Sequence, residues 1–428
     1  MCPRNVRTGL MMDSVRRSLV AVVTLAVIAP LTLTACNGGG TNKASAPWIT
    51  SAPSSAPASA GAPLTESAST GGKTEITVSP ADGKKNVPIS AEVGFKISGG
   101  KLGTVVVKDA KGKSVSGALR DDGSSWIPSK PLANKQKYAA TVTATDAAGA
   151  VITKSTSFTT MGKPAKKTGT GLYLFDDHTY GVAMPVVVEF VPGIKKADRA
   201  AVQKRMFVKT DPPQPGTWSW TSTGTQAYYR APEFWQTGTK LSVRIAVGGL
   251  PTGGGRYGSQ DRSASAKIGR SLVMKVENSS KKMTVIENGK TIRTMPVSLG
   301  KKSTPSSSGT MVIMDKQTST VFDTTDTDGA NGYKETIGYA QRLTWSGQYI
   351  HSAPWSVGDQ GHRNVSHGCV NLSPSNAKWI FGKSLIGDPI TVRGTEDKLV
   401  YGNGWTPWNV SWKEFVKGSA LPVPAGLA

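Results

Sequence analysis

The chain has 428 residues and a formal net charge of +23, with 51 Lys and Arg side chains against 28 Asp and Glu. This length is enough for several domains with apolar cores of their own, so burial can stabilise the fold. Three cysteines in the whole chain exclude a scaffold held together by a disulfide framework.

The first 35 residues have the pattern of an export signal. Four arginines precede the apolar run SLVAVVTLAVIAPLTLTAC, which ends at Cys36. Pro30 interrupts the run and CNGGG follows it, so a membrane-spanning helix is the weaker interpretation. The residues from Leu33 to Cys36 resemble a bacterial lipobox, with an ordinary cleavage site as the alternative. We expect signal residues 1–35 to be removed and Cys36 to be lipidated, which would hold an exported protein on the outer face of the cell membrane.

A stretch poor in charge and rich in Ala, Ser and Pro follows, from residue 36 to residue 72. Because it cannot bury an apolar core, we expect a disordered tether. Most of the excess positive charge of the exported chain lies before residue 271. It predicts attraction to anionic lipid headgroups or wall polymers, with a merely solvated surface as the alternative. Nucleic acid is not an expected partner outside the cell.

Short apolar–polar alternations begin at Lys73. TEITVSP, AEVGFKI, TVVVKDAKGKSV, YAATVTATDAAG and ITKSTSFTT read as strands, with hairpin turns at DAKG and DAAG. Regular spacing over about 90 residues predicts an immunoglobulin-like sandwich over 73–161. A weak repeat of the same pattern predicts a second sandwich over 162–270, where KADRAAVQKRM adds a helical turn.

A third β-rich unit is predicted over 271–395. SLVMKVENSSKKMTVIENGKTIRTMPVSLGK reads as strands joined by turns, with a hairpin at Asn288-Gly289. GTMVIMDKQ, GQYIHSAP and DPITVRG are further strands, and Ser373-Pro374 opens one short helix. We expect residues from about 318 to 347 to form a loop that closes over a ligand. The fold class is therefore mainly β, with two tandem sandwiches before this unit.

The C-terminal extension, 396–428, carries Trp405, Trp408 and Trp412 within eight residues. Such a group of rings could bind sugars. Docking of the extension onto a neighbouring domain is the interpretation we favour, because tryptophan contributes a large apolar surface.

Three of the four histidines and one cysteine gather in YIHSAPWSVGDQGHRNVSHGCVNLS. A zinc site would use ligands from the set His351, His362, His367 and Cys369. Their spacing matches no C-x-x-C or H-E-x-x-H pattern, and no glutamate lies nearby to activate a metal-bound water. We therefore expect no metal and no cofactor.

A cysteine nucleophile accounts for more of these residues. The Cys369 thiol needs a base, which His351 on a neighbouring strand or His367 could provide. Gly368 lets the backbone turn, so that successive amides could point at one oxyanion. If the segment is extended, the side chains of His367 and Cys369 share a face.

His351, fourteen intervening residues and then the motif SHGCVN from Ser366 to Asn371 resemble the signature of the L,D-transpeptidase (YkuD-type) catalytic domain. HSAPWSVGDQGHRNVSHGCVNLSPSNAKW is similar to mycobacterial members, which also have a lipid anchor, two immunoglobulin-like domains and a Trp-rich extension. The resemblance implies a peptidoglycan L,D-transpeptidase. In that family the cysteine attacks the diaminopimelate carbonyl of a donor tetrapeptide stem and releases D-Ala. The side-chain amine of an acceptor stem then forms a 3→3 cross-link.

The resemblance also implies roles by position. Cys369 would be the nucleophile and His351 its base, oriented by the backbone carbonyl of Ser352. Amides of His367, Gly368 and Cys369 would bind the oxyanion, and the His367 side chain would tune the site. The implied substrate-binding residues are Tyr333, Met314, Ser346, Gly347, Trp355 and Asn371. Carbapenems are expected to acylate Cys369.

Two alternatives remain open on the residues alone. Water instead of an amine would make the chain an L,D-carboxypeptidase, because the two reactions share the acyl-enzyme. A wall-binding lipoprotein with an inactive catalytic domain is the second alternative.

Overall fold

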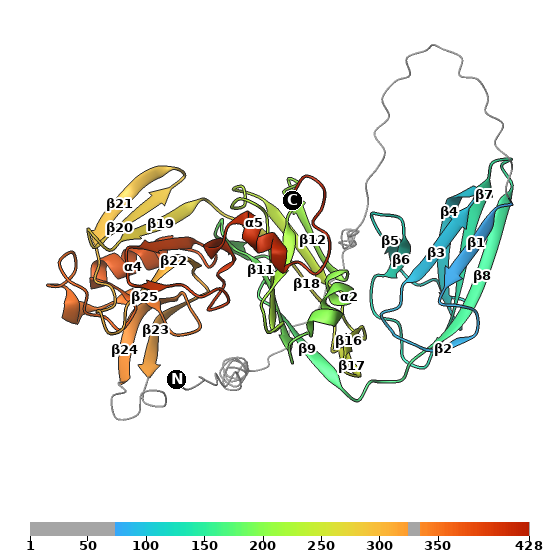
Figure 1. Ribbon diagram of the computed structural model, residues 1–428, viewed down its shortest axis with the longest axis horizontal. Helices are drawn as coiled ribbons and strands as arrows, with labels where there is room; N and C mark the ends of the chain where they lie inside the picture. Colours follow the sequence, from blue (N-terminus) through green and yellow to red (C-terminus); the bar gives the residue numbers. More distant parts are fainter. Residues whose placement is uncertain (1–72, 324–333, 428) are drawn as a thin grey trace, which may run out of the picture. The chain divides into compact units, whose positions relative to one another are not determined.

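The computed structural model describes residues 73–323 and 334–427, and Figure 1 shows their arrangement along the chain. These residues form three β-rich regions followed by a short C-terminal segment. The predicted fold class, mainly β with an immunoglobulin-like part before the third unit, is confirmed. No helix in 73–323 or 334–427 has the length and apolar character needed to cross a membrane.

The first region is a sandwich of two four-stranded sheets, ordered β1-β3-β6-β5 and β2-β8-β7-β4. Its hairpin turns lie where the sequence predicts them, since β7 leads into β8 through Gly149 at φ 85°. Its core is closed around Trp126, Val142 and Phe158. The strands are β1 (Glu75–Ser79), β2 (Lys84–Val87), β3 (Val93–Ser98), β4 (Gly100–Asp109), β5 (Gly117–Leu119), β6 (Ser125–Pro128), β7 (Lys137–Asp146) and β8 (Val151–Thr160).

The second region pairs a four-stranded sheet, β10-β18-β15-β12, with a six-stranded sheet, β13-β14-β11-β9-β17-β16. The predicted helical turn is present as η1 (Lys196–Asp198) and α2 (Arg199–Gln203). The strands are β9 (Lys167–Leu172), β10 (Thr179–Tyr180), β11 (Val186–Val191), β12 (Met206–Asp211), β13 (Thr217–Trp220), β14 (Gln226–Arg230), β15 (Lys240–Ile245), β16 (Pro251–Gly253), β17 (Arg256–Gly258) and β18 (Arg262–Ile268).

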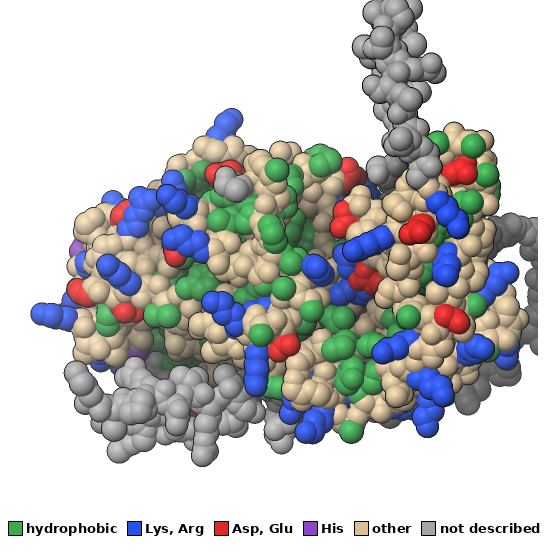
Figure 2. Space-filling model, turned by 45° about the vertical axis from the view of Figure 1, so that its right-hand side comes forward, with side chains coloured by type: hydrophobic (Ala, Val, Ile, Leu, Met, Phe, Trp, Pro, Cys, Tyr) green, Lys and Arg blue, Asp and Glu red, His purple; other side chains and the backbone are tan. Residues whose placement is uncertain are grey.

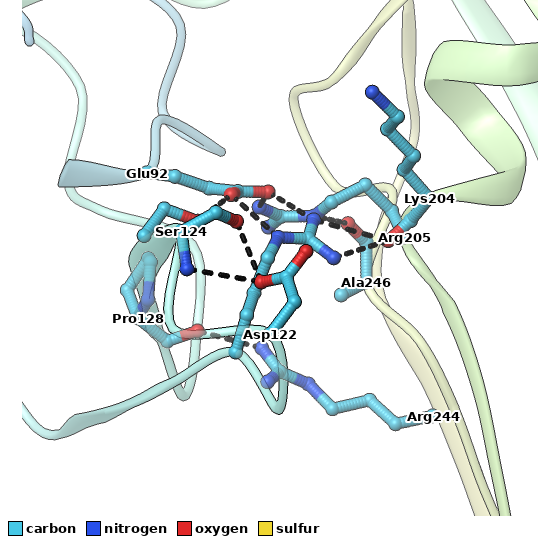
Figure 3. A network of polar contacts seen from close by, with 10 residues as sticks. Glu92, Asp122, Ser124, Pro128, Lys204, Arg205, Arg244 and Ala246 are labelled. Atoms are coloured by element: carbon cyan, nitrogen blue, oxygen red, sulfur yellow. Dashed lines mark hydrogen bonds and ion pairs between the residues drawn. The ribbon is translucent and has the colours of Figure 1, made fainter. Parts of the chain in front are cut away.

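The two sandwiches meet through a polar network, drawn in Figure 3. The carboxylate of Glu92 accepts hydrogen bonds from Arg120, from Arg205 at 2.7 Å and from the hydroxyl of Ser125. Arg205 also donates to the carbonyl of Ala246 at 3.1 Å. A buried guanidinium from the second sandwich is thus neutralised by a carboxylate from the first.

The third region contains a six-stranded sheet, β21-β20-β19-β27-β22-β28, and a four-stranded sheet, β23-β24-β25-β26. Asn288 and Gly289 have φ values of 49° and 81°, as a two-residue hairpin turn requires. The elements are β19 (Leu272–Glu277), β20 (Lys282–Glu287), β21 (Lys290–Pro296), β22 (Ser307–Val312), β23 (Asp315–Asp323), β24 (Lys334–Arg342), β25 (Tyr349–Ser352), η3 (Pro354–Ser356), β26 (Val370–Leu372), α4 (Pro374–Lys383), β27 (Pro389–Arg393) and β28 (Asp397–Lys398).

Helix α4 begins where the sequence predicts it. The Ser373 hydroxyl accepts a hydrogen bond from the Asn376 amide at 3.3 Å, and Pro374 occupies the first helical turn. The predicted loop over 318–347 is wrong for most of its described residues, because strands β23 and β24 pair antiparallel there. Residues 343–347 follow β24 and belong to no strand, and residues 324–333 lie outside the described part of the chain.

The C-terminal segment packs on the second sandwich. It contains η4 (Pro407–Asn409), α5 (Trp412–Phe415) and η5 (Val416–Gly418). Trp408 donates from Nε1 to the carbonyl of Ala183 at 2.7 Å. The Arg230 guanidinium lies over the rings of Trp408 and Trp412. Docking, favoured by the sequence, is therefore the arrangement that the structure shows.

Candidate active site

Two short parallel strands, β25 and β26, place the histidine and the cysteine. Ile350 pairs with Val370 and His351 pairs with Asn371, so Cys369 directly precedes β26. Side chains alternate along a strand, and paired residues of neighbouring strands point the same way. His351, Asn371 and Cys369 therefore share one face of the four-stranded sheet.

His351 is buried, and its ring orientation is fixed by a backbone carbonyl. Its side chain is buried, at 4% exposure, and its Nδ1 lies 2.8 Å from the carbonyl oxygen of Ser352. A carbonyl can only accept, so Nδ1 carries the proton and Nε2 offers a lone pair. Burial lowers the pKa of His351, against smaller opposing effects of the Ser352 carbonyl and of Asn371. The imidazole is therefore neutral near pH 7.

Cys369 is a free, buried thiol at 7% exposure. Its sulfur lies 3.7 Å from the carbonyl oxygen of Gly347, which accepts the S–H. Burial raises the pKa of Cys369 to about 12, while the backbone amide of Tyr349 lowers it by a smaller amount. The resting pair is thus a neutral thiol and a neutral imidazole, so the thiol must lose its proton to the base as it attacks.

A tight turn leads into the nucleophile. Gly368 has φ +118°, and its amide donates to the hydroxyl of Ser366 at 3.1 Å. That hydroxyl in turn donates to the carbonyl of Cys369 at 2.8 Å. The segment is therefore bent where we considered an extended one, and His367 is exposed while Cys369 is buried. The Gly368 amide, expected to bind an oxyanion, is already bonded to Ser366.

The Ser346-Gly347 turn lies against the thiol through its backbone. The Ser346 amide and hydroxyl are held by the side chain of Asn403, at 3.0 and 2.9 Å. Gly347 has φ +93°, and a Cβ there would meet the Phe322 ring at 3.4 Å. This packing fixes the carbonyl that accepts the S–H of Cys369.

Asn371 and Trp355 lie beside the base. Asn371 is buried and donates to the hydroxyl of Ser356 at 3.1 Å, while its Oδ1 has no hydrogen-bond partner among the described residues. The Trp355 ring lies 6.0 Å from the His351 ring and is 55% exposed. An exposed ring over a buried base suits contact with a bound chain.

The structure does not bring every predicted residue to this face. Met314 is buried in the apolar cluster shared with the second sandwich, and its sulfur lies 3.2 Å from the amide nitrogen of Trp405. Its role as a pocket wall stays a prediction. Tyr333 and Cys36 lie outside the described residues.

Sequence reasoning missed three residues around the turn. Gln348 exchanges hydrogen bonds with Ser307, and its side chain lies 3.6 Å from the position of a Cβ on Gly368. Lys301 reaches the ring of His367, with Nζ 3.1 Å from Nε2. No short motif signals these contacts, because they join residues 20 or more positions apart in the sequence.

The zinc alternative finds no support in residues 73–323 and 334–427, where no group of three or more His, Cys, Asp and Glu side chains is placed to hold a metal. His362, one of the four candidate ligands, is an exposed residue of the connection between η3 and β26. The described geometry is that of a thiol and a base.

Comparison with known families gives two matches. A bacterial Ig domain model matches residues 84–251, which include strands of both sandwiches. A model of the L,D-transpeptidase catalytic domain matches residues 272–392, which contain His351 and Cys369.

Individual proteins give the same result. The chain is 32% identical over 351 residues to L,D-transpeptidase 2 of Mycobacterium tuberculosis, covering 81% of this chain and 85% of that protein. It is 33% identical over 359 residues to L,D-transpeptidase 5 of the same species, with 82% and 78% covered. A similar solved structure is that of LdtMt1 in complex with imipenem, with 35% identity, a TM-score of 0.45, and 54% of this chain and 100% of that one covered. The resemblance in the sequence is thereby confirmed, and the chain belongs to the L,D-transpeptidase family of enzymes.

Proposed function

We propose that the protein cross-links peptidoglycan stems, with Cys369 as nucleophile and His351 as base. The observation that carries this proposal is the placement of a buried thiol and a neutral, oriented imidazole on one sheet face. The partners would be a donor and an acceptor stem peptide, and the reaction needs no cofactor.

In the first half-reaction, Sγ of Cys369 attacks the carbonyl carbon of diaminopimelate in the donor tetrapeptide. His351 Nε2 takes the thiol proton as the C–S bond forms. The tetrahedral intermediate then collapses, the C–N bond to D-Ala breaks, and His351 returns the proton to the leaving amine. A thioester remains on Cys369.

In the second half-reaction, the side-chain amine of an acceptor stem attacks the thioester carbon. A C–N bond forms, the C–S bond breaks, and the proton lost by the amine passes through His351 to the thiolate. The product is a 3→3 cross-link, and the enzyme returns to its starting state. Water in place of the amine would give the tripeptide of a carboxypeptidase.

The oxyanion is best bound by the backbone of the turn that carries the nucleophile. The Cys369 amide would donate directly. The Gly368 amide would join it after exchanging its bond to Ser366, with the remaining donor from His367. Asn371, Trp355 and the Ser346-Gly347 turn would contact the stem.

The same thiol should react with carbapenems. A strained β-lactam amide presents a carbonyl of the kind that Cys369 attacks, and ring opening leaves a thioester on the cysteine. The ring nitrogen leaves the carbonyl carbon but stays tethered through the rest of the opened ring, so no fragment departs and the adduct retains the mass of the whole carbapenem.

The exported location is part of the proposal. Lipidation at Cys36 would hold the chain on the outer face of the membrane, with residues 36–72 as a tether to the wall. Lys and Arg side chains are spread over the face drawn in Figure 2, with Asp and Glu between them. Such a surface is compatible with weak attraction to anionic wall polymers rather than with one defined binding patch.

The test is mass spectrometry on the full-length chain in detergent, incubated with a diaminopimelate-containing disaccharide-tetrapeptide. Loss of D-Ala together with a cross-linked dimer, absent from Cys369→Ala, is the expected result. Tripeptide without dimer would replace the transpeptidase with the carboxypeptidase. A Cys369→Ala variant that still binds wall, with no product from either form, would favour the wall-binding lipoprotein.

A further inference from the structure

A lysine and a histidine stand together at the rim of the site. Nζ of Lys301 lies 3.1 Å from Nε2 of His367, and both residues are exposed. His367 is two residues before the nucleophile, so its contact with Lys301 brings a positive charge to the exposed side of the turn that carries Cys369. The mechanism above gives Lys301 no role.

The backbone holds Lys301 against the nucleophile turn. Gly300 forms a parallel bridge with Ser366, and the Lys301 amide donates to the Ser366 carbonyl at 2.9 Å. The Thr304 hydroxyl donates to the same carbonyl at 3.3 Å. The backbone of Lys301 is therefore hydrogen-bonded to Ser366, three residues before Cys369 in the sequence. The position of Lys301 does not depend on its side-chain contact with His367 alone.

The contact fixes which atoms can act. An ammonium group only donates, so Nε2 of His367 is the acceptor in this contact. One N–H of the Lys301 ammonium group donates to this ring nitrogen, and the other two N–H groups can donate to another acceptor. The printed side-chain contact of Lys301 is thus with a ring nitrogen and not with a carboxylate.

No described carboxylate lies within ion-pair distance of Lys301, in contrast to Arg363, which pairs with Asp359. Arg342, the other cation near the site, donates to the carbonyls of Thr344 and Trp345 and lies over the rings of Trp345 and Tyr349. Of these three cations, Lys301 is the one that contacts His367 in the nucleophile turn and forms no ion pair among the described residues.

The proposed reaction supplies an anion at the matching place. The scissile bond joins diaminopimelate to a terminal D-Ala, so a free carboxylate lies one residue beyond the carbonyl that Cys369 attacks. We propose that Lys301, steadied by His367, binds this terminal carboxylate and makes the enzyme select donors that end directly after the scissile bond. This inference rests on the proposed function.

The experiment measures kcat/KM for release of the C-terminal residue by the full-length chain in detergent. Two donors are compared, the tetrapeptide with a free D-Ala carboxylate and the same peptide ending in D-alaninamide. Lys301→Gln removes the charge, and Lys302→Gln is the matched control, because Lys302 is the exposed neighbour and carries the same charge. Lys301→Arg keeps the charge.

We expect Lys301→Gln to lose about tenfold in kcat/KM on the free acid, as for one charge-assisted hydrogen bond at a partly solvated site. The amide donor should change less than about twofold, Lys302→Gln should match the wild type on both donors, and Lys301→Arg should recover most of the loss. Alkylation of Cys369 by neutral iodoacetamide should be equal in all forms, showing that the turn is intact.

Equal losses on both donors, or no loss on the free acid, would overturn the assignment of Lys301 to the carboxylate. The same loss in Lys302→Gln would also overturn it, since diffuse surface charge would then account for the effect. If the wild type releases neither D-Ala from the free acid nor D-alaninamide from the amide donor, the proposed function itself fails, and that outcome is distinct from all of these.

Discussion

The two junctions between the three β regions differ in chemistry. The first and second sandwiches meet through Glu92, Arg120 and Arg205, a network of ion pairs and hydrogen bonds (Figure 3). The second sandwich and the C-terminal segment share one apolar cluster, which Val312 and Met314 of the catalytic region also enter. The core of the first sandwich and the main core of the catalytic region are separate clusters.

This difference indicates which parts fold together. Apolar burial is non-directional and accumulates with area, so a shared core makes its contributors one cooperative unit. An ion-pair network depends on geometry and on both partners keeping their charge. We infer that the catalytic region depends on the second sandwich and on the C-terminal segment, and much less on the first sandwich.

The largest effect should come from cutting the shared apolar core. Trp405 is 3% exposed, and Trp405→Ala should lower the free energy of unfolding of the catalytic unit by about 3–5 kcal/mol, from lost burial and a cavity. Trp355→Ala is the matched control, because its exposed ring should change stability by no more than about 0.5 kcal/mol. Chemical denaturation followed by far-UV circular dichroism measures the free energy of unfolding of both variants. Equal losses of stability in the two variants would contradict a shared core.

Breaking the polar junction between the two sandwiches should lower the stability somewhat less than Trp405→Ala does, and the effect should be local to that junction. Glu92→Gln leaves the buried Arg205 without its carboxylate, which should destabilise the junction by about 3 kcal/mol. Asp122→Asn, at an exposed carboxylate beside the network, serves as the control. Hydrogen exchange should increase around Glu92 and Arg205 while α4 and β26 stay protected. Faster exchange in α4 would show that the two junctions are coupled.

Low pH should reproduce part of the destabilisation caused by Glu92→Gln, because it protonates the Glu92 carboxylate. Burial raises the pKa of Glu92, but the hydrogen bonds from Arg120, Ser125 and Arg205 outweigh it and lower the pKa to about 2. A depressed carboxyl pKa stabilises the folded state above the unfolded pKa and loses that contribution as the pH falls. Between pH 7 and pH 3 the wild type should lose about 2 kcal/mol more than Glu92→Gln. Identical pH profiles in denaturation would rule out the ion pair as the cause.

The acylation of Cys369 should depend on pH over a different range from the stability of the sandwich junction. Because burial lowers the pKa of His351, its imidazole becomes protonated at a lower pH than an ordinary histidine does. Acylation of Cys369 by a carbapenem should therefore fall less than about fourfold from pH 7.5 to pH 6, the fall that an unshifted histidine would give. Stopped-flow measurement of the adduct checks this, and a steeper fall would mean that the pKa of His351 is not lowered.

Removal of the first sandwich should have the smallest effect. A chain beginning at residue 162 keeps the whole shared apolar cluster, so its rate of acylation should stay within about twofold of the full-length rate. A polar replacement of Arg205, such as Arg205→Gln, avoids leaving its buried charge unpaired in this form. A much slower reaction would show that the first sandwich supports the active site.

Much of this organisation follows from local signals in the sequence. Asn288-Gly289 specifies a two-residue turn because both residues tolerate positive φ, and Ser373-Pro374 specifies a helix start through its capping hydroxyl. The motif from Ser366 to Asn371, with His351 before it, was long enough to identify the family. Such signals depend on residues that are close together in the sequence, so they can be recognised from the sequence alone.

Other features were decided only by contacts between distant segments. The positive φ of Gly368 turns His367 out of the face of Cys369, and the neighbouring 300–306 turn then supplies Lys301. Met314 packs in the apolar cluster that also contains Trp405, and its role as a pocket wall stays a prediction. The sequence by itself determined the residues of the chemistry and the β architecture, because period, turn residues and motif are local. Tertiary structure decided burial, protonation and the partners of each side chain, because these depend on which distant residues come to lie within a few ångströms.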